Sequence, residues 1–151
     1  MNCLILPRTI RDEMLALADR ERPCECCGLL LGKTDPNQQS SSTFLASTFW
    51  PLVNELHSPT AFRSEPRSLF EAYRRMRSSG EAIVAVYHSH PTSEAVPSRR
   101  DREELTYPDA LTVIAGSPRN AWEIRAWRWG NDGFAEVGID VIESSPRAII
   151  N

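Results

Sequence analysis

The chain has 151 residues, enough for one domain with a hydrophobic core and too few for two. Its apolar and charged shares, 41% and 25%, are those of an ordinary globular protein and exclude a disordered chain. Seventeen Lys and Arg residues against twenty Asp and Glu residues give a net charge of −3, which argues against nucleic acid or an anionic membrane surface as the main partner.

The compartment is predicted from the apolar runs and the cysteines. No apolar run approaches the roughly 20 residues that a helix needs to cross a bilayer. The start of the chain, MNCLILPRTI, lacks the positively charged segment and long apolar run of a secretory signal. Cys3 stands alone, and Cys24, Cys26 and Cys27 lie too close together for a disulfide framework. We therefore expect a cytoplasmic protein.

The first half of the chain predicts strands that alternate with a helix. In chain order we expect an edge strand at residues 3–6, a helix at 9–22 with Thr9 as its N-cap, a buried strand at 28–32 and a strand at 44–53 that Pro51 weakens. Residues 33–43 are polar and rich in turn-forming residues, so they are expected to form a surface loop.

The second half predicts a helix at 66–78, a central strand at 82–87 (AIVAVY), a helix at 98–106, and strands at 111–115, 122–129 and 134–142. The GNDG between the last two strands indicates a hairpin. Helices interleaved with strands predict an α/β fold: a single layered domain over residues 1–142, with a mixed central β-sheet flanked by helices and a tail at 143–151.

Two of the three histidines lie one residue apart in the stretch VYHSHPTSEAVPSRRDREE. Because side chains alternate along an extended chain, His88 and His90 project from the same side and form a natural pair of zinc ligands. Asp101 follows His90 with ten residues between them, and the first turn of the expected helix holds it back toward the strand's end. Two histidines and one carboxylate leave a fourth tetrahedral position open, which is the arrangement of catalytic zinc sites.

Glu25, in PCECCGLLLG, is the candidate proton shuttle. It precedes an apolar strand among small residues and cysteines, where a carboxylate is costly unless it has a partner or a function. Partial burial raises the pKa of such a carboxyl toward the operating pH. Amide cleavage by a metal-bound water also needs a group that moves protons, so Glu25 is expected to be the general acid and base.

Together, PCECCGLLLG and HSHPTSEAVPSRRD resemble the signature of the JAMM (MPN-plus) metalloprotease family. That signature is a glutamate before a Gly-Leu-rich strand, then His-x-His-Pro and a Ser and an Asp at fixed spacing. VNELHSPTAFR and IRAWRW are also similar to stretches of prokaryotic members, so the resemblance covers residues 9–141 approximately. It implies a cytidine-deaminase-like fold, one zinc ion held by His88, His90 and Asp101, Glu25 as the general acid and base, and Ser98 as an oxyanion stabiliser.

The resemblance also implies a substrate. Members of the family cleave at the C-terminal Gly-Gly of ubiquitin or ubiquitin-like proteins, and some stand-alone prokaryotic members release a group such as cysteine from a ubiquitin-like sulfur-carrier protein. This compact chain has little room for the insertions that grip ubiquitin, so it is most similar to the stand-alone type. A Gly-Gly tail needs a narrow groove with an exposed strand edge, and the stretch at residues 54–62 is expected to supply one wall.

Three of these site residues have a second interpretation. Ser98 and Asp101 also fit a capping box at the start of the expected helix, and an aspartate used there would be lost to the metal. Ser98 reaches an oxyanion only if its hydroxyl also points to the cleft. Glu25 has an alternative partner in Arg22.

Other residues of ligand type are expected to be structural. Cys24 and Cys27 form a Cys-x-x-Cys, but no second pair follows at zinc-finger spacing, so structural thiols are predicted. His57 lies in a Pro- and Ser-flanked loop and is a weak candidate for a third ligand. Core or sheet-face positions are expected for three tryptophans: Trp122, Trp127 and Trp129.

The predicted function is therefore a zinc metallopeptidase that hydrolyses an amide bond at the Gly-Gly of a carrier conjugate. The main alternative is a catalytically silent scaffold of the same fold that binds protein partners, although such relatives typically lose a histidine or the acid. A zinc nucleoside deaminase would need a Pro-Cys-x-x-Cys ligand pair after its His-x-Glu, and the order here differs. A zinc-stabilised module would not leave a coordination position open.

Overall fold

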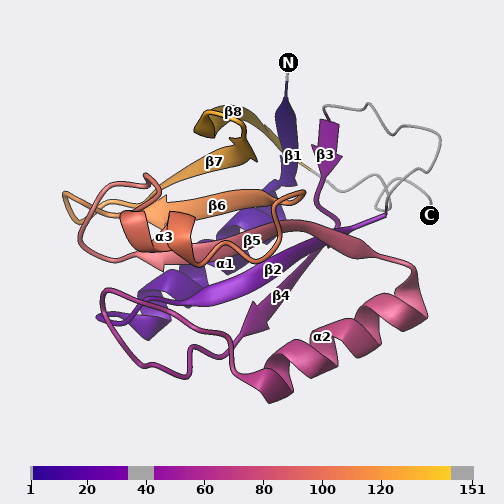
Figure 1. Cartoon of the computed structure of the whole chain (residues 1–151), viewed down its shortest axis with the longest axis horizontal. Coiled ribbons are helices and arrows are strands. Elements are labelled where there is room, and N and C mark those ends of the chain that lie inside the picture. Colours follow the sequence, from indigo (N-terminus) through magenta and orange to yellow (C-terminus); the bar gives the residue numbers. More distant parts are fainter. Residues whose placement is uncertain (1, 34–42, 144–151) are drawn as a thin grey trace.

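The structure, a computed structural model, describes residues 2–33 and 43–143. Most of the predicted loop at 33–43 and nearly all of the predicted tail at 143–151 lie outside these residues, so the proposed division into domain and tail stays a prediction. The strands are β1 Cys3–Pro7, β2 Cys27–Gly32, β3 Thr43–Leu45, β4 Thr48–Leu52, β5 Ala82–His90, β6 Leu111–Gly116, β7 Glu123–Gly130 and β8 Gly133–Ile142, and the helices are α1 Arg8–Glu21, α2 Pro66–Ser79 and α3 Arg99–Glu103 (Figure 1).

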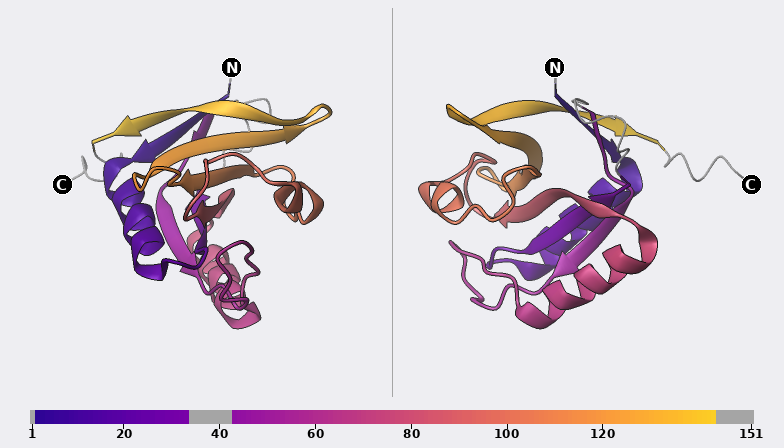
Figure 2. Two further views of the ribbon diagram at one scale, coloured as in Figure 1. Left: turned by 90° about the vertical axis from the view of Figure 1, so that its left-hand side faces the viewer. Right: turned by 45° about the vertical axis from the view of Figure 1, so that its right-hand side comes forward.

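The eight strands form one mixed sheet in the order β3-β1-β8-β7-β6-β5-β2-β4. The sheet curls around α1, because this helix contacts β1 and β8 near one end of the sheet and β4 at the other end (Figure 2). The buried residues of α1 recur at helical spacing and face this concave side: Ile10, Met14, Leu17 and Ala18. The predicted α/β domain with a mixed sheet flanked by helices is confirmed.

The strand β2 is buried on both faces, which explains its unbroken apolar run. Leu30 packs into the larger core with α1, whereas Leu29 and Leu31 pack into a second core with Ala72 of α2. Next to β2 lies β5, which pairs antiparallel with β2 and parallel with β6. The backbone that carries the two histidines is thus held by hydrogen bonds on both sides.

Three local predictions are wrong. The strand at residues 3–6 is not an edge strand, because β1 lies between β3 and β8. The predicted strand at 44–53 is two strands, which the short link at Ala46–Ser47 sends to opposite edges of the curled sheet. Thr9 does not cap α1, which begins at Arg8 after Pro7 without a side-chain cap. The GNDG hairpin is confirmed by the pairing of Gly130 with Gly133.

No helix among the described residues has the length and apolar character needed to span a membrane.

A buried carboxylate joins α2 and β5 to the edge strand β4. The side chain of Glu81 is 2% exposed. It accepts hydrogen bonds from Ser47 Oγ at 2.9 Å, Thr48 Oγ1 at 2.7 Å and Arg75 Nε at 3.1 Å. Burial by itself would raise the pKa of Glu81. Hydrogen bonds from Thr48, Ser79, Ser47 and Arg75 outweigh burial and lower this pKa to about 2.

Replacing Glu81 with glutamine is expected to lower the free energy of unfolding by about 2 kcal/mol at neutral pH, because it removes the buried charge that accepts hydrogen bonds from two hydroxyls and a partly exposed guanidinium. The folded-state pKa lies below the unfolded one, so this contribution is present above about pH 5 and is lost as the pH falls toward 2. Urea unfolding at about pH 7 and about pH 3 measures the difference, which should shrink at the lower pH. Glu71→Gln, on the exposed side of α2, is the matched control. Equal stability of Glu81→Gln and wild type at neutral pH contradicts the prediction.

Candidate active site

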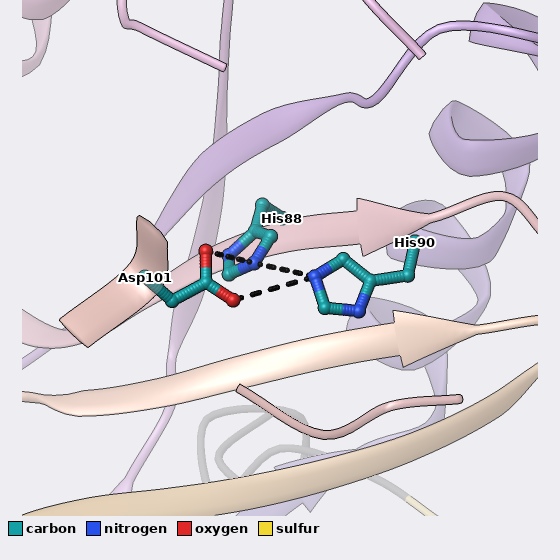
Figure 3. Close-up of side chains that lie close together, drawn as sticks. All are labelled: His88, His90 and Asp101. Carbon is teal, nitrogen blue, oxygen red and sulfur yellow. Dashed lines mark hydrogen bonds and ion pairs between the residues drawn. The ribbon is translucent and has the colours of Figure 1, made fainter. Parts of the chain in front are cut away.

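The two histidines lie inside β5, because the strand continues past the predicted end at Tyr87 to His90. Both rings are buried and project from the same side of the strand, with their Nε2 atoms 3.2 Å apart (Figure 3). His90 is oriented by its Nδ1, which lies 2.9 Å from the carbonyl oxygen of Glu94. His88 is oriented by stacking on Phe62, with ring centroids 4.5 Å apart, and its buried Nδ1 has no hydrogen-bond partner among the described residues.

The short helix α3 brings Asp101 to the histidines. Asp101 Oδ1 lies 3.2 Å from His88 Nε2, and Oδ2 lies 3.4 Å from His90 Nε2. The capping box is also present: the Ser98 amide donates to Asp101 Oδ2 at 2.8 Å, and the Asp101 amide donates to Ser98 Oγ at 3.1 Å. The two interpretations of Asp101 do not compete, since each carboxylate oxygen has lone pairs for two partners.

The three side chains fit a zinc ion. Four ligands around zinc at about 2.0–2.1 Å lie roughly 3.3–3.4 Å from one another in a tetrahedron. The donor atoms of His88, His90 and Asp101 are 3.2–3.4 Å apart, and all candidate ligand atoms of the cluster lie within 4.8 Å of one another. Two imidazoles and a carboxylate are also the ligand types that zinc uses in open catalytic sites. The cluster is thus compatible with a metal site.

Burial and hydrogen bonds shift the pKa of each of the three residues of the cluster. Burial lowers the pKa of His88, which favours the neutral ring that ligates metals. For His90, burial also acts to lower the pKa, but the hydrogen bonds with Asp101 and the Glu94 carbonyl outweigh it and raise the pKa. Burial would raise the pKa of Asp101, but its hydrogen bonds with the two histidines hold the pKa far below the ordinary value. Asp101 is therefore a carboxylate at any physiological pH.

Glu25 lies in the irregular segment between α1 and β2 and is 5% exposed. Burial raises the pKa of Glu25 to about 7, the charges of His90 and Arg100 oppose the rise, and the charge of Asp101 adds to it. Glu25 does not pair with Arg22, the alternative partner, because the Arg22 guanidinium contacts Asp19, the Pro91 carbonyl and Ser117.

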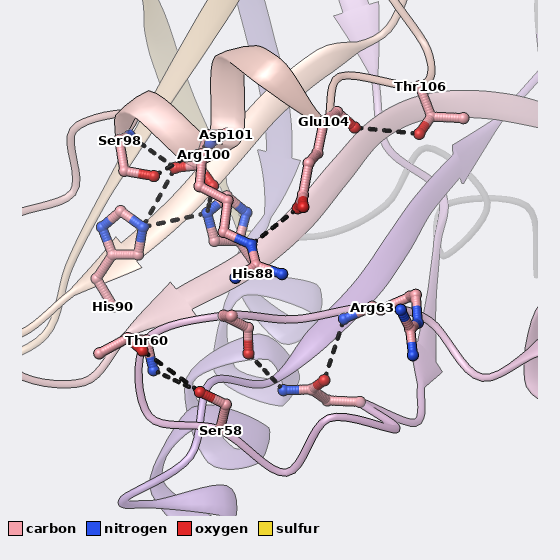
Figure 4. A network of polar contacts seen from close by, with 12 residues as sticks. Ser58, Thr60, Arg63, His88, His90, Ser98, Arg100, Asp101, Glu104 and Thr106 are labelled. Carbon is pink, nitrogen blue, oxygen red and sulfur yellow. Dashed lines mark hydrogen bonds and ion pairs between the residues drawn. The ribbon is translucent and has the colours of Figure 1, made fainter.

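His88 and Asp101 help to line a cleft of about 340 Å³. One wall is the loop between β4 and α2, which contributes Phe62, Arg63 and Ser64, and the other is α3 with the segment that follows it. Figure 4 shows His88 between these two walls, with Arg63 on one side and Arg100 on the other. Of the stretch at residues 54–62, which was expected to form one wall of a groove for a Gly-Gly tail, Phe62 lines this cleft, and the lining continues to Ser64.

The remaining candidate ligands lie outside the metal cluster. Among the described residues, the cluster consists of His88, His90 and Asp101 and does not include His57. All four cysteines are free, and burial raises the pKa of Cys27 to about 12, so this thiol stays protonated. Trp127 donates its indole N–H to the Ala95 carbonyl at 2.9 Å and so supports the loop after β5.

Two contacts of the site were missed by the sequence-based reasoning. Phe62 stacks on a candidate ligand from a loop 26 residues earlier in the chain, and nothing in its local pattern marks it. Asn54 lies in the VNELHSPTAFR stretch and hydrogen-bonds the backbone of Glu25. A lone asparagine between a strand and a helix usually indicates a turn, so its spacing carried no signal of this contact.

Known proteins are similar to this chain over most of its length. The family described as prokaryotic homologs of the JAB domain matches residues 7–130. A protein named CysO-cysteine peptidase from Mycobacterium tuberculosis is 30% identical over 141 residues, which are 93% of this chain and 92% of that protein. A desampylase from Haloferax volcanii is 30% identical over 143 residues, 91% of this chain and 96% of that protein. The solution structure of a Desulfitobacterium hafniense protein has a TM-score of 0.83 at 28% identity and covers 95% of this chain and 96% of that one.

Proposed function

The chain belongs to the prokaryotic homologs of the JAB domain, the stand-alone type of JAMM protein, and from this premise we propose that it is a zinc-dependent peptidase or isopeptidase. Its substrate is an amide bond at the C-terminal Gly-Gly of a ubiquitin-like or sulfur-carrier protein conjugate. Relatives named as a CysO-cysteine peptidase, a desampylase and a probable TtuB-protein conjugate cleaving protease support the substrate class.

The observation that carries the proposal is the tetrahedral spacing of three donor atoms beside a buried glutamate. His88, His90 and Asp101 would hold one zinc ion. Bound there, zinc supplies a Lewis acid that polarises a carbonyl and lowers the pKa of water. Glu25 takes the proton from the attacking water and passes it to the leaving amine, a task that its pKa of about 7 suits at neutral pH.

Ser98 is proposed to stabilise the oxyanion. Its oxygen accepts the hydrogen bond from the Asp101 amide and thereby caps α3. A serine hydroxyl has one hydrogen and two lone pairs, so the hydroxyl hydrogen remains available to donate to the oxygen of the scissile carbonyl. Such a donor is worth most where charge develops in the transition state.

The cleft supports a slender substrate. His88 and Asp101 are among its lining residues, so an extended tail laid between Phe62 and the segment after α3 would lie against the proposed metal ligands. Glycines at the end of such a tail bring no side chains to widen the path. We also propose a cytoplasmic location, which the four free cysteines support.

The test is hydrolysis of a carrier protein that ends in Gly-Gly joined through an amide to one further residue or to a lysine side chain. Mass spectrometry should detect the freed carrier with the zinc-loaded protein. A chelator should abolish release and added zinc should restore it. A protein that binds zinc tightly yet cleaves no such conjugate would instead be the silent scaffold.

A further inference from the structure

The loop between β4 and α2 is closed at its base. Asn54 and Ser64 form an isolated antiparallel bridge, and the Glu55 amide donates to the Arg63 carbonyl at 2.9 Å. The same loop supplies Phe62, which stacks on His88. Whatever fixes this loop therefore also fixes one wall of the cleft and the ring of a proposed metal ligand.

Asn54, at the base of this loop, is buried, with 9% of the residue exposed. Its side-chain oxygen accepts from the amides of Leu56 and Arg63, both at 3.1 Å. Its nitrogen donates to the carbonyls of Ala61 at 3.0 Å and Glu25 at 2.9 Å. An asparagine amide has two donors and two acceptor sites, so all four are used, and a flipped amide would face two carbonyl oxygens with its own oxygen.

The loop holds the peptide of Glu25 at both ends. The Glu25 amide donates to the Ser58 carbonyl at 2.8 Å, and the Glu25 carbonyl accepts from Asn54 Nδ2. Glu25 lies two residues before β2 begins, so no strand pairing fixes its backbone. The backbone position of the proposed proton shuttle therefore depends on a loop that begins 29 residues later in the chain.

We propose that Asn54 is a positioning residue that locks the loop at residues 54–64 onto the Glu25 peptide and so fixes the backbone that carries the Glu25 carboxylate. The inference rests on the proposed role of Glu25. It adds that one asparagine fixes both the backbone of Glu25 and the loop whose Phe62 stacks on His88. A displacement of about 1 Å at a catalytic group costs about a hundredfold in rate, so loss of this tether should appear mainly in kcat.

The test uses two replacements in the full chain. Asn54→Ala removes all four hydrogen bonds. Asn54→Asp has nearly the same shape and keeps the two acceptor bonds to Leu56 and Arg63, but it removes both donors and so releases the Glu25 carbonyl. The matched control is Thr60→Ala, which changes an exposed residue of the same loop whose hydroxyl lies 3.4 Å from Ser58 Oγ. Rates are compared at about pH 9, where a carboxyl with a raised pKa is ionised in each variant.

Both Asn54 variants are expected to lower kcat about 10- to 100-fold. Asn54→Asp keeps the bonds that close the loop over His88, so its zinc dissociation constant should change less than about threefold. In Asn54→Ala, amide hydrogen exchange at Glu25 should accelerate at least about tenfold. In Asn54→Asp, the amides of Leu56 and Arg63 should stay protected while kcat still falls. Thr60→Ala should match wild type in every measurement.

Wild-type kcat in Asn54→Asp overturns the inference, because loop closure without the tether would then suffice. A parallel loss of zinc affinity in Asn54→Asp, which keeps the loop closed, also overturns it, since the residue would then support the metal ligands and not only Glu25. Unchanged exchange at Glu25 in Asn54→Ala does so as well. The exchange measurement needs no substrate. If wild type cleaves no carrier conjugate, the proposed function fails. Amide hydrogen exchange at Glu25 still tests whether Asn54 holds the Glu25 backbone.

Discussion

Replacing Glu25 with glutamine is expected to lower the rate of conjugate hydrolysis by about 10²–10⁴-fold while zinc stays bound. Glutamine keeps the shape of the side chain but has no lone pair basic enough to take a proton from water. Glu25 is not among the residues of the metal cluster, so zinc content should not change. Steady-state kinetics and mass spectrometry of the zinc-loaded variant measure both quantities.

Glu21→Gln is the matched control for this replacement, because Glu21 is exposed four residues earlier at the end of α1. It should retain wild-type turnover. Near-wild-type hydrolysis by Glu25→Gln would remove Glu25 from the proposed mechanism and leave the proton transfer to another group.

The raised pKa of Glu25 also predicts how activity and stability depend on pH. A base must be ionised, so activity should be lost as the pH falls through the pKa, which is about 7 without a metal. A bound cation favours the carboxylate, so the acidic limb of the pH–activity profile of the zinc-loaded enzyme should lie at or below this value.

In the metal-free protein, the raised pKa of Glu25 means that this carboxyl holds its proton more tightly in the folded state than in the unfolded state. Stability should therefore fall as the pH rises from about 4.5 to 7, a fall that Glu25→Gln should lack.

Replacing Asp101 with asparagine is expected to weaken zinc binding by about 100-fold or more. The change removes the single negative charge of the ligand set and leaves two neutral imidazoles. Asparagine can still accept the hydrogen bond from the Ser98 amide, so α3 should keep its cap. Competition with a metal-binding dye measures the affinity, and circular dichroism checks that the fold is retained.

Glu103→Gln is the control for Asp101→Asn, because Glu103 lies on the same helix and pairs with Arg99 on the surface. It should bind zinc as wild type does. Wild-type zinc affinity in Asp101→Asn would show that Asp101 is only a helix cap, and the proposal of a three-residue metal site would then fail.

Much of the fold and most of the site follow from the sequence by itself. Apolar runs bounded by glycine and proline identify β2 and β5, and the period-2 alternation of strand side chains places His88 and His90 on one side. The spacing to Asp101, together with a serine that starts α3, returns the carboxylate to the same place. Such patterns involve residues close together in the chain, where backbone geometry limits the possible arrangements.

Other features depended on the tertiary structure. The curl of the sheet around α1 decided that the predicted strand at 44–53 divides between two edges and that β1 has neighbours on both sides. Burial decided that the pKa of Glu25 rises to about 7. The contacts of Asn54 with Glu25 and of Phe62 with His88 join segments 26–29 residues apart through an irregular loop. Strand and helix periodicity carries no information about where such a loop lies, because its position is set by the packing of the whole chain against it.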